Sequence, residues 1–343
     1  MNDDSHSRER SSGSSLAGPS LAVIAAVALG AALFFMRPVL VPLVLAILLS
    51  YLVAPVVDLM QIRLKIPRSL AVIIAFILAG ALIGAVVLMI SSSAAQLAGK
   101  ADVYQAKLVD MGNQALAVVQ GLGVPVDADV VRTQIAELPV GSLLASTLNS
   151  VVNSASTLFL VLIFVIYLVA GRTPGEHKRG VYKEIDLKIR KYISIKVLLS
   201  GATGLLAGLL LWMIGLDLAA VFGVLAFLLN FIPSVGSVVA TLLPLPLAIV
   251  QFDSTAAIVA VLVLPGTVQM VIGNVLEPKL MGTSLNLHPI TVLLSLIFWG
   301  MLWGPAGMVL AAPITAVLKI ILDRVESTRP VADLLAGKLP DSG

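Results

Sequence analysis

One stretch limits what this chain can fold into: residues 197–318 form an almost continuous apolar run. The run contains only four charged residues, which are Asp217, Asp253, Glu277 and Lys279. A bilayer-spanning helix needs about 20 consecutive apolar residues, so the run holds several such lengths in succession. The whole chain is 59% apolar and 12% charged, whereas soluble domains carry about 25% charged residues. We therefore predict an integral membrane protein that crosses the bilayer several times.

Polar and charged segments divide the rest of the chain into further predicted spans. We predict an all-α integral membrane protein with about six transmembrane helices and two re-entrant or broken helical hairpins; eight transmembrane helices is the alternative. The predicted segments are a disordered cytoplasmic tail over 1–19, three membrane helices over 20–90 (Leu21–Met36, Pro38–Met60 and Leu70–Ile90), an external helical segment over 91–149, a fourth membrane helix over 150–170, a basic amphipathic cytoplasmic segment over 171–196, a transport core over 197–322 and a cytoplasmic C-terminal tail over 323–343.

The positions of the basic residues predict the orientation. Most of the 22 Lys and Arg residues lie in the N-terminal tail, the turn at 61–69, the segment 171–196 and the C-terminal tail. Cytoplasmic loops of membrane proteins carry such an excess, so both termini are predicted to be cytoplasmic and 91–149 to be outside. Apolar residues from Leu97 onward recur in steps of four and three, which favours a helix packed against its own neighbour. A contact between subunits is the alternative.

The apolar run is interrupted at two corresponding places. Pro233–Gly236 and Gly304–Gly307 each join two half-length apolar segments, and each is followed by a further proline. Proline cannot donate a backbone hydrogen bond, and backbone groups freed in hydrocarbon must be satisfied by protein or by a wet cavity. Transporters use such discontinuous helices, in corresponding positions of two repeats, to form substrate and ion sites. We therefore predict two weak repeats of opposite topology, with broken pairs over 218–250 and 288–322.

The most polar point of this half is the stretch Gly273–Gly282 (GNVLEPKLMG). An ionisable residue at membrane depth is a functional hypothesis by default, and Glu277 and Lys279 are expected to pair with each other or to cap the surrounding helix ends. The alternative is an ordinary interfacial turn in which both charges contact water. Asn230 and Asn274 supply amides to a ligand or cap the broken backbone. The residues predicted to form the transport path or the substrate or ion site are Asn230, Pro233, Ser234, Gly236, Asn274, Glu277, Pro278, Lys279, Thr291, Gly304, Pro305 and Gly307.

Several kinds of chemistry are not expected of this sequence. The chain has no cysteine, and its histidines, His6, His177 and His288, are far apart. Thiolate and disulfide chemistry are therefore excluded, and a metal site is not predicted. No phosphate-binding loop, nucleophile elbow or His-Glu-x-x-His motif is present. We predict no catalytic residues, no cofactor and no enzymatic activity.

A set of motifs in this chain resembles the AI-2E transporter family (autoinducer-2 exporter-like, PerM-type permeases). The likeness covers nearly the whole chain after the tail, and 273–313 is its most specific part. The motifs are Ala54-Pro55-Val56-Val57-Asp58, Lys65-Ile66-Pro67-Arg68-Ser69, Asn230-Phe231-Ile232-Pro233-Ser234-Val235-Gly236, the stretch Gly273–Gly282, Leu287-His288-Pro289, and Trp303–Gly307 (WGPAG) with Ala312-Pro313.

The resemblance implies a multi-pass permease of the bacterial inner membrane that forms homo-oligomers, with a pentamer as one option. It implies a secondary transporter that exports a small polar solute of the autoinducer-2 type, a quorum-sensing signal. Sodium (or potassium)/proton antiport is an alternative, and an oligomeric membrane scaffold without transport is another. An uncharged polar signal would suit amide and hydroxyl contacts, whereas cation exchange would need a buried carboxylate, for which Glu277 is the best candidate. No nucleic-acid partner is expected.

Overall fold

The computed structural model describes residues 6–121, 158–171, 180–281, 285 and 287–338, and every regular element in these ranges is helical. The helices are α1 (His6–Phe35), α2 (Arg37–Leu64), α3 (Arg68–Gly99), α4 (Ala101–Gly121), a helix over Leu158–Ala170, α7 (Val181–Ile214), α8 (Ala219–Leu229), α9 (Val235–Leu242), α10 (Leu245–Gln251), α11 (Thr255–Val271), a π-helical turn (Ile272–Leu276), α12 (Glu277–Met281), α13 (Pro289–Leu322), a 3₁₀ turn (Glu326–Thr328) and α14 (Arg329–Leu335).

Five of the described helices are long and apolar enough to cross a bilayer. These are Arg37–Leu64, Arg68–Leu97, Val181–Ile214, Thr255–Met281 and Pro289–Leu322. Shorter apolar helices cover Val23–Phe35, Leu158–Ala170, Ala219–Leu229 and Val235–Gln251. The prediction of an all-helical membrane protein with several spans is therefore confirmed. The first predicted span has only a short apolar helix, and part of the fourth lies outside the described residues.

Two predicted boundaries differ from the structure. Helix α1 begins at His6, inside the segment predicted to be a disordered tail, because extending an existing helix costs far less than nucleating one. Helix α7 runs from Val181 to Ile214 without interruption, so the structure has no boundary at 196. The sequence contains neither Gly nor Pro between Val181 and Ser200, and nothing stops the amphipathic helix from continuing into the span.

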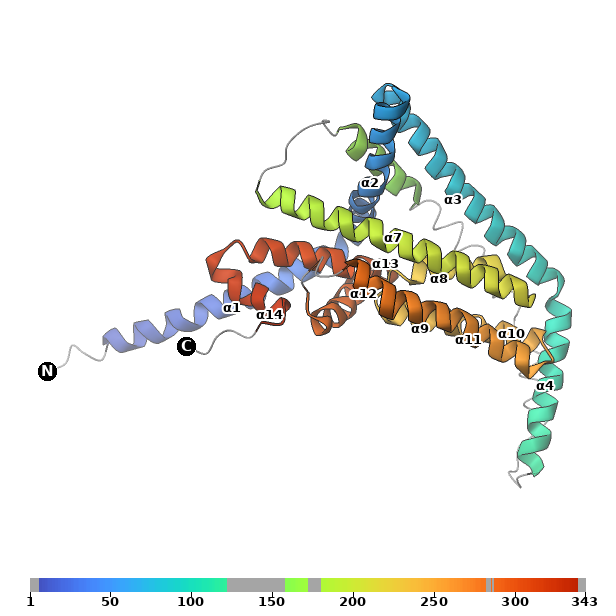
Figure 1. Ribbon diagram of the computed structural model, residues 1–343. Coiled ribbons are helices and arrows are strands. Elements are labelled where there is room, and N and C mark those ends of the chain that lie inside the picture. Colours follow the sequence, from blue (N-terminus) through green and yellow to red (C-terminus); the bar gives the residue numbers. More distant parts are fainter. Residues whose placement is uncertain (1–5, 122–157, 172–179, 282–284, 286, 339–343) are drawn as a thin grey trace.

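Helix α7 lies beside both α8 and α11 and forms the central bundle with them, from which α1 and α3 project (Figure 1). Small residues bring α7 and α8 into backbone contact. A Cβ atom added at Gly204 would lie 2.6 Å from the carbonyl oxygen of Gly223, and one added at Gly208 would lie 3.2 Å from the Cα of Gly223. Small residues allow such close approach in membrane helices, so the two helices pack at the shortest distance that their backbones permit.

The first predicted broken pair is a helical hairpin. Helix α8 ends at Leu229, and α9 starts at Val235 and returns along it, so that Ala226 and Ala240 share one core cluster with Ala207 of α7. Ser234 at the turn has a φ of 59°, a left-handed conformation that side chains other than glycine adopt rarely. A Cβ atom on Gly236 would lie 1.8 Å from the carbonyl oxygen of Leu229, so only glycine fits there without a shift.

The second broken pair repeats this geometry inside α13. Gly304 has a φ of 64° and a ψ of −146°, which breaks the helix into two arms. The arms face each other, since Trp299 donates a hydrogen bond from Nε1 to Oγ1 of Thr315 at 3.2 Å. A Cβ atom on Gly307 would lie 1.9 Å from the carbonyl oxygen of Trp299. Gly307 therefore has the same steric role as Gly236, and the two tips are built alike.

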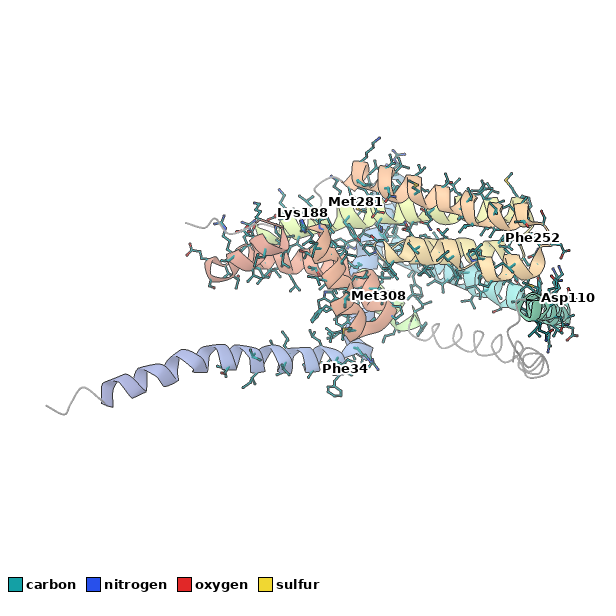
Figure 2. The ribbon with its side chains drawn as sticks, turned by 90° about the horizontal axis from the view of Figure 1, so that it is seen from below. Phe34, Asp110, Lys188, Phe252, Met281 and Met308 are labelled. Carbon is teal, nitrogen blue, oxygen red and sulfur yellow. The ribbon has the colours of Figure 1, made fainter. Side chains whose placement is uncertain are left out.

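Polar contacts fasten α4 to the base of the first hairpin. Lys100 forms an ion pair with Asp217, which also accepts a hydrogen bond from the Tyr104 hydroxyl at 2.5 Å. Lys107 pairs with Asp253 at 3.1 Å. Asp217 precedes α8 and Asp253 follows α10, so α4 holds both ends of the hairpin. We call this side of the molecule the α4 end; Figure 2 shows Asp110 and Phe252 there, and Lys188 with Met281 at the opposite, α12 end.

Replacing Asp217 by Asn is expected to loosen α4. Burial alone would raise the pKa of Asp217, but hydrogen bonds from Lys100 and Tyr104 outweigh it and lower the pKa. The charged contact therefore stabilises the fold at neutral pH and is lost only as the pH falls through that lowered value, below the ordinary ~3.9 of an aspartate. A partly exposed pair contributes roughly 1 kcal/mol, so the amides at the start of α4 should exchange hydrogen about fivefold faster.

Asp110→Asn is the matched control for hydrogen–deuterium exchange. Asp110 lies on the same helix, is exposed and accepts a hydrogen bond from Gln114 at 2.9 Å within α4. Equal exchange rates in the two variants would show that Asp217 does not hold α4 in place.

Candidate functional site

A cavity of about 550 Å³ lies between the first hairpin, α7 and the α11–α12 segment. It reaches from the tip of the hairpin to the π-helical turn. Its walls carry amides, hydroxyls and one ion pair beside small and apolar side chains. The lining residues are Lys196, Asn230, Ile232, Pro233, Ser234, Ser237, Val238, Thr241, Leu242, Gly266, Gln269, Met270, Gly273, Asn274 and Glu277.

Lys196 and Glu277 form an ion pair in the cavity wall. Lys196 donates from Nζ to Oε1 of Glu277 at 2.5 Å, and its side chain is only 2% exposed. The Glu277 side chain is 23% exposed and borders the cavity. A buried charge is retained only when it is paired and hydrogen-bonded. Each charge therefore offsets the desolvation cost of burying the other.

The spacing of buried residues along α7 places Lys196 in the cavity wall. Ile189, Tyr192, Ile193 and Lys196 recur at helical spacing on the buried side of the helix, so the ammonium group follows the apolar face rather than the solvated one. Glu277 comes directly after the π-helical turn at Ile272–Leu276. Such turns interrupt the regular hydrogen bonds of a helix and are frequent at functional sites.

The hairpin tip contributes neutral polar groups. Asn230 caps α8, is 2% exposed and donates from Nδ2 to Oγ of Ser200 on α7 at 3.0 Å. Thr241 donates its hydroxyl to the backbone oxygen of Ser237 at 2.9 Å. Gln269 on α11 is 6% exposed, and its Oε1 has no partner among the described residues. The tip is thus fixed to α7 by a side-chain hydrogen bond next to the cavity.

The structure brings together some of the predicted site residues and separates others. Asn230, Pro233, Ser234, Asn274 and Glu277 all line the cavity. The remaining predicted residues lie elsewhere: Gly236 packs against Leu229 behind the tip, Pro278 and Lys279 are exposed, Thr291 is buried in α13, and Gly304, Pro305 and Gly307 form the tip of the second hairpin.

Lys279 is not the partner of Glu277, because the carboxylate pairs with Lys196 on α7. Sequence reasoning placed Lys196 among the loop cations and missed it as a site residue. The helical spacing from Ile189 was the available signal for its burial. Ser237, Thr241 and Gln269 were also missed, since isolated polar residues in an apolar helix give no pattern that distinguishes a cavity from a helix contact.

The lining of the cavity has no net charge. Lys196 is its one cation and Glu277 its one anion among the lining residues, and the two are paired. Among the described residues no group of three or more His, Cys, Asp or Glu side chains is arranged to hold a metal ion. The amides and hydroxyls of the lining suit hydrogen bonding to a small molecule.

Known transport proteins are similar to this chain over most of its length. Residues 22–327 match the family described as AI-2E family transporter. The chain is 32% identical to the AI-2 transport protein TqsA of Escherichia coli (strain K12), over 88% of this chain and 90% of that protein. It is 30% identical to a Borreliella burgdorferi protein named "Putative transport protein", over 86% and 84% of the two chains. This chain therefore belongs to the AI-2E transporter family and is a multi-pass membrane transport protein rather than an enzyme.

Proposed function

We propose that this protein is a secondary transporter that exports a small, uncharged polar solute of the autoinducer-2 type through the cavity beside the first hairpin. One observation carries the proposal: amide and hydroxyl groups from three separate elements face a single cavity that has no net charge. Transport proteins commonly bind solutes where broken helices meet at membrane depth. The similarity to a relative named as an AI-2 transport protein supports the choice of solute.

Cation/proton antiport is the second candidate. Glu277 is a carboxylate on the cavity wall within an apolar helical segment, and such residues often carry ions or protons. Its pairing with Lys196 at 2.5 Å counts against this candidate, because the ammonium group already neutralises the carboxylate that a bound cation would need. A scaffold without transport has no observation in its favour at the cavity.

We further propose that the α12 end faces the cytoplasm. The basic residues of the first half of α7, such as Lys188, lie at this end (Figure 2), and an excess of basic residues is typical of the cytoplasmic side. Both termini would then be cytoplasmic and α4 would lie outside, in the bacterial inner membrane. The homo-oligomer implied by the family resemblance remains a prediction.

Thr241→Val is expected to reduce solute flux about fivefold, because it removes one hydroxyl from the cavity at nearly constant volume and hydrogen bonds contribute about 1 kcal/mol each. The measurement is autoinducer-2 efflux from proteoliposomes. Thr267→Val is the matched control, since the Thr267 hydroxyl also donates to the carbonyl four residues earlier, at 2.7 Å, but is exposed and lies outside the lining. Wild-type liposomes that release the solute no faster than protein-free ones would reject the proposal.

A further inference from the structure

The cavity lining carries one positive and one negative charge. Lys196 and Glu277 are its only charged members, they lie 2.5 Å apart, and they come from different elements, α7 and α12. Lys279 belongs to the same short helix as Glu277 but is exposed and does not line the cavity. Tyr192, on α7 one turn before Lys196, is buried close to Glu277 and is uncharged when protonated. The carboxylate therefore has one cationic partner among the described residues.

The two members of the pair are buried to different extents. The Lys196 side chain is 2% exposed, whereas that of Glu277 is 23% exposed and borders the cavity. A cation that enters the cavity reaches Glu277 more readily than it reaches any other charged group. In a wall of low dielectric an uncompensated carboxylate attracts a cation strongly, and a tethered ammonium group at contact distance cancels that attraction.

We propose that Lys196 is a specificity-determining residue that excludes cations from the cavity. It acts as a built-in counter-cation that occupies the carboxylate, so that the cavity accepts uncharged polar solutes and rejects monovalent cations. This inference rests on the proposed function and deepens it, because it names the residue that sets the charge class of the solute.

Loss of the Lys196 ammonium group is expected to make the cavity permeable to monovalent cations. Removing the ammonium group while keeping Glu277 leaves the cavity with a net charge of −1. A monovalent cation can then bind Glu277 in place of the Lys196 ammonium group. An unpaired charge in such a wall is worth more than a tenfold change in affinity. Sodium uptake by wild-type proteoliposomes should equal that of protein-free liposomes. We therefore expect uptake by Lys196→Met proteoliposomes to exceed this background rate by at least about tenfold.

The experiment measures ²²Na⁺ uptake into proteoliposomes and, in parallel, the thermal unfolding of the purified protein. Unfolding is followed in sodium chloride and in N-methyl-D-glucamine chloride at equal ionic strength. Sodium should stabilise Lys196→Met, since an ion that binds only the folded state raises its stability, and should leave the wild type unchanged. Lys196→Gln, which keeps a hydrogen-bond donor without the charge, should behave in the same way and serves if the methionine variant does not fold.

The double variant Lys196→Met/Glu277→Gln is the matched control. It also lacks the ammonium group, but its cavity is again neutral, so sodium should neither enter nor stabilise it. If the double variant takes up sodium as fast as Lys196→Met, the space left by the lysine side chain, and not the carboxylate, admits the ion. That result would overturn the proposal. So would a folded Lys196→Met or Lys196→Gln protein that shows no sodium effect in either measurement.

Different results would reject the role of Lys196 and the proposed function. Wild-type protein that exports autoinducer-2 while both single variants ignore sodium would reject the role of Lys196 and leave the solute class intact. Wild-type protein that takes up sodium in exchange for protons would reject the exclusion by Lys196 and favour antiport over the proposed function.

Discussion

Replacing Glu277 by Gln is expected to lower the stability of the folded protein by about 3 kcal/mol, because it strands a buried ammonium group. The Lys196 side chain is 2% exposed and donates to Glu277, and the loss of one partner from a buried ion pair costs far more than the pair itself contributes. Lys196→Met should cost less, since Glu277 borders the cavity and water reaches its carboxylate. The unequal burial of the two side chains thus predicts unequal penalties.

Thermal unfolding of the purified variants in lipid nanodiscs checks this expectation. Glu326→Gln is the control, because Glu326 is exposed in a short 3₁₀ turn and should change stability very little. The double variant Lys196→Met/Glu277→Gln removes both charges and should recover most of the loss, as a double-mutant cycle requires for an interacting pair. A double variant as unstable as Glu277→Gln alone would contradict the pairing.

Gly236→Ala and Gly307→Ala are expected to have the largest effects of any Gly→Ala substitution among the described residues. The added methyl group would lie 1.8 Å from the Leu229 carbonyl oxygen in the first case and 1.9 Å from that of Trp299 in the second. Both obstacles are backbone atoms, which cannot rotate away as a flexible side chain can. Each hairpin must open at its tip, and steric conflicts of this kind cost about 4 kcal/mol or more.

Fluorescence-detected size-exclusion chromatography gives the yield of folded protein for both variants, and thermal unfolding gives its stability. Gly201→Ala is the matched control: Gly201 is a glycine of α7, and an added Cβ atom there meets nothing within 4 Å. Alanine in a helix interior should stabilise the control by roughly 0.5–1 kcal/mol relative to glycine. Normal yield and stability for Gly236→Ala or Gly307→Ala would mean that the arms do not meet at the tips in this way.

The spans and the breaks were predictable because both are local properties of the sequence. Apolar runs of sufficient length gave the positions of α2 and α3, and proline with glycine gave the two tips at Pro233–Gly236 and Gly304–Gly307. Physical rules at the scale of a few residues decide these features: the length needed to cross a bilayer and the missing backbone donor of proline.

The cavity was predictable only in part, because it depends on which helices meet. Asn230 and Glu277 stand out as polar residues in apolar surroundings, and both line it. The partner of Glu277 is 81 residues away on another helix, and Lys279, two positions away in sequence, was the more obvious choice. Likewise, the polar residue Thr291 resembled a path residue but is buried in α13, away from the cavity. No periodicity encodes such distant pairings.

The contact of α7 with α8 has a kinematic consequence. Backbone atoms of Gly204 and Gly208 meet those of Gly223 directly, with no side chains between them that could change rotamer and absorb a displacement. Sliding or tilting one helix against the other would force backbone atoms into overlap. Helices α7 and α8 therefore have few relative degrees of freedom and are expected to move as one rigid unit. Any change in access to the cavity must then involve the other lining elements, α9 and the α11–α12 segment. Distances between spin labels on α7 and on those elements should vary, while the distance between α7 and α8 stays constant.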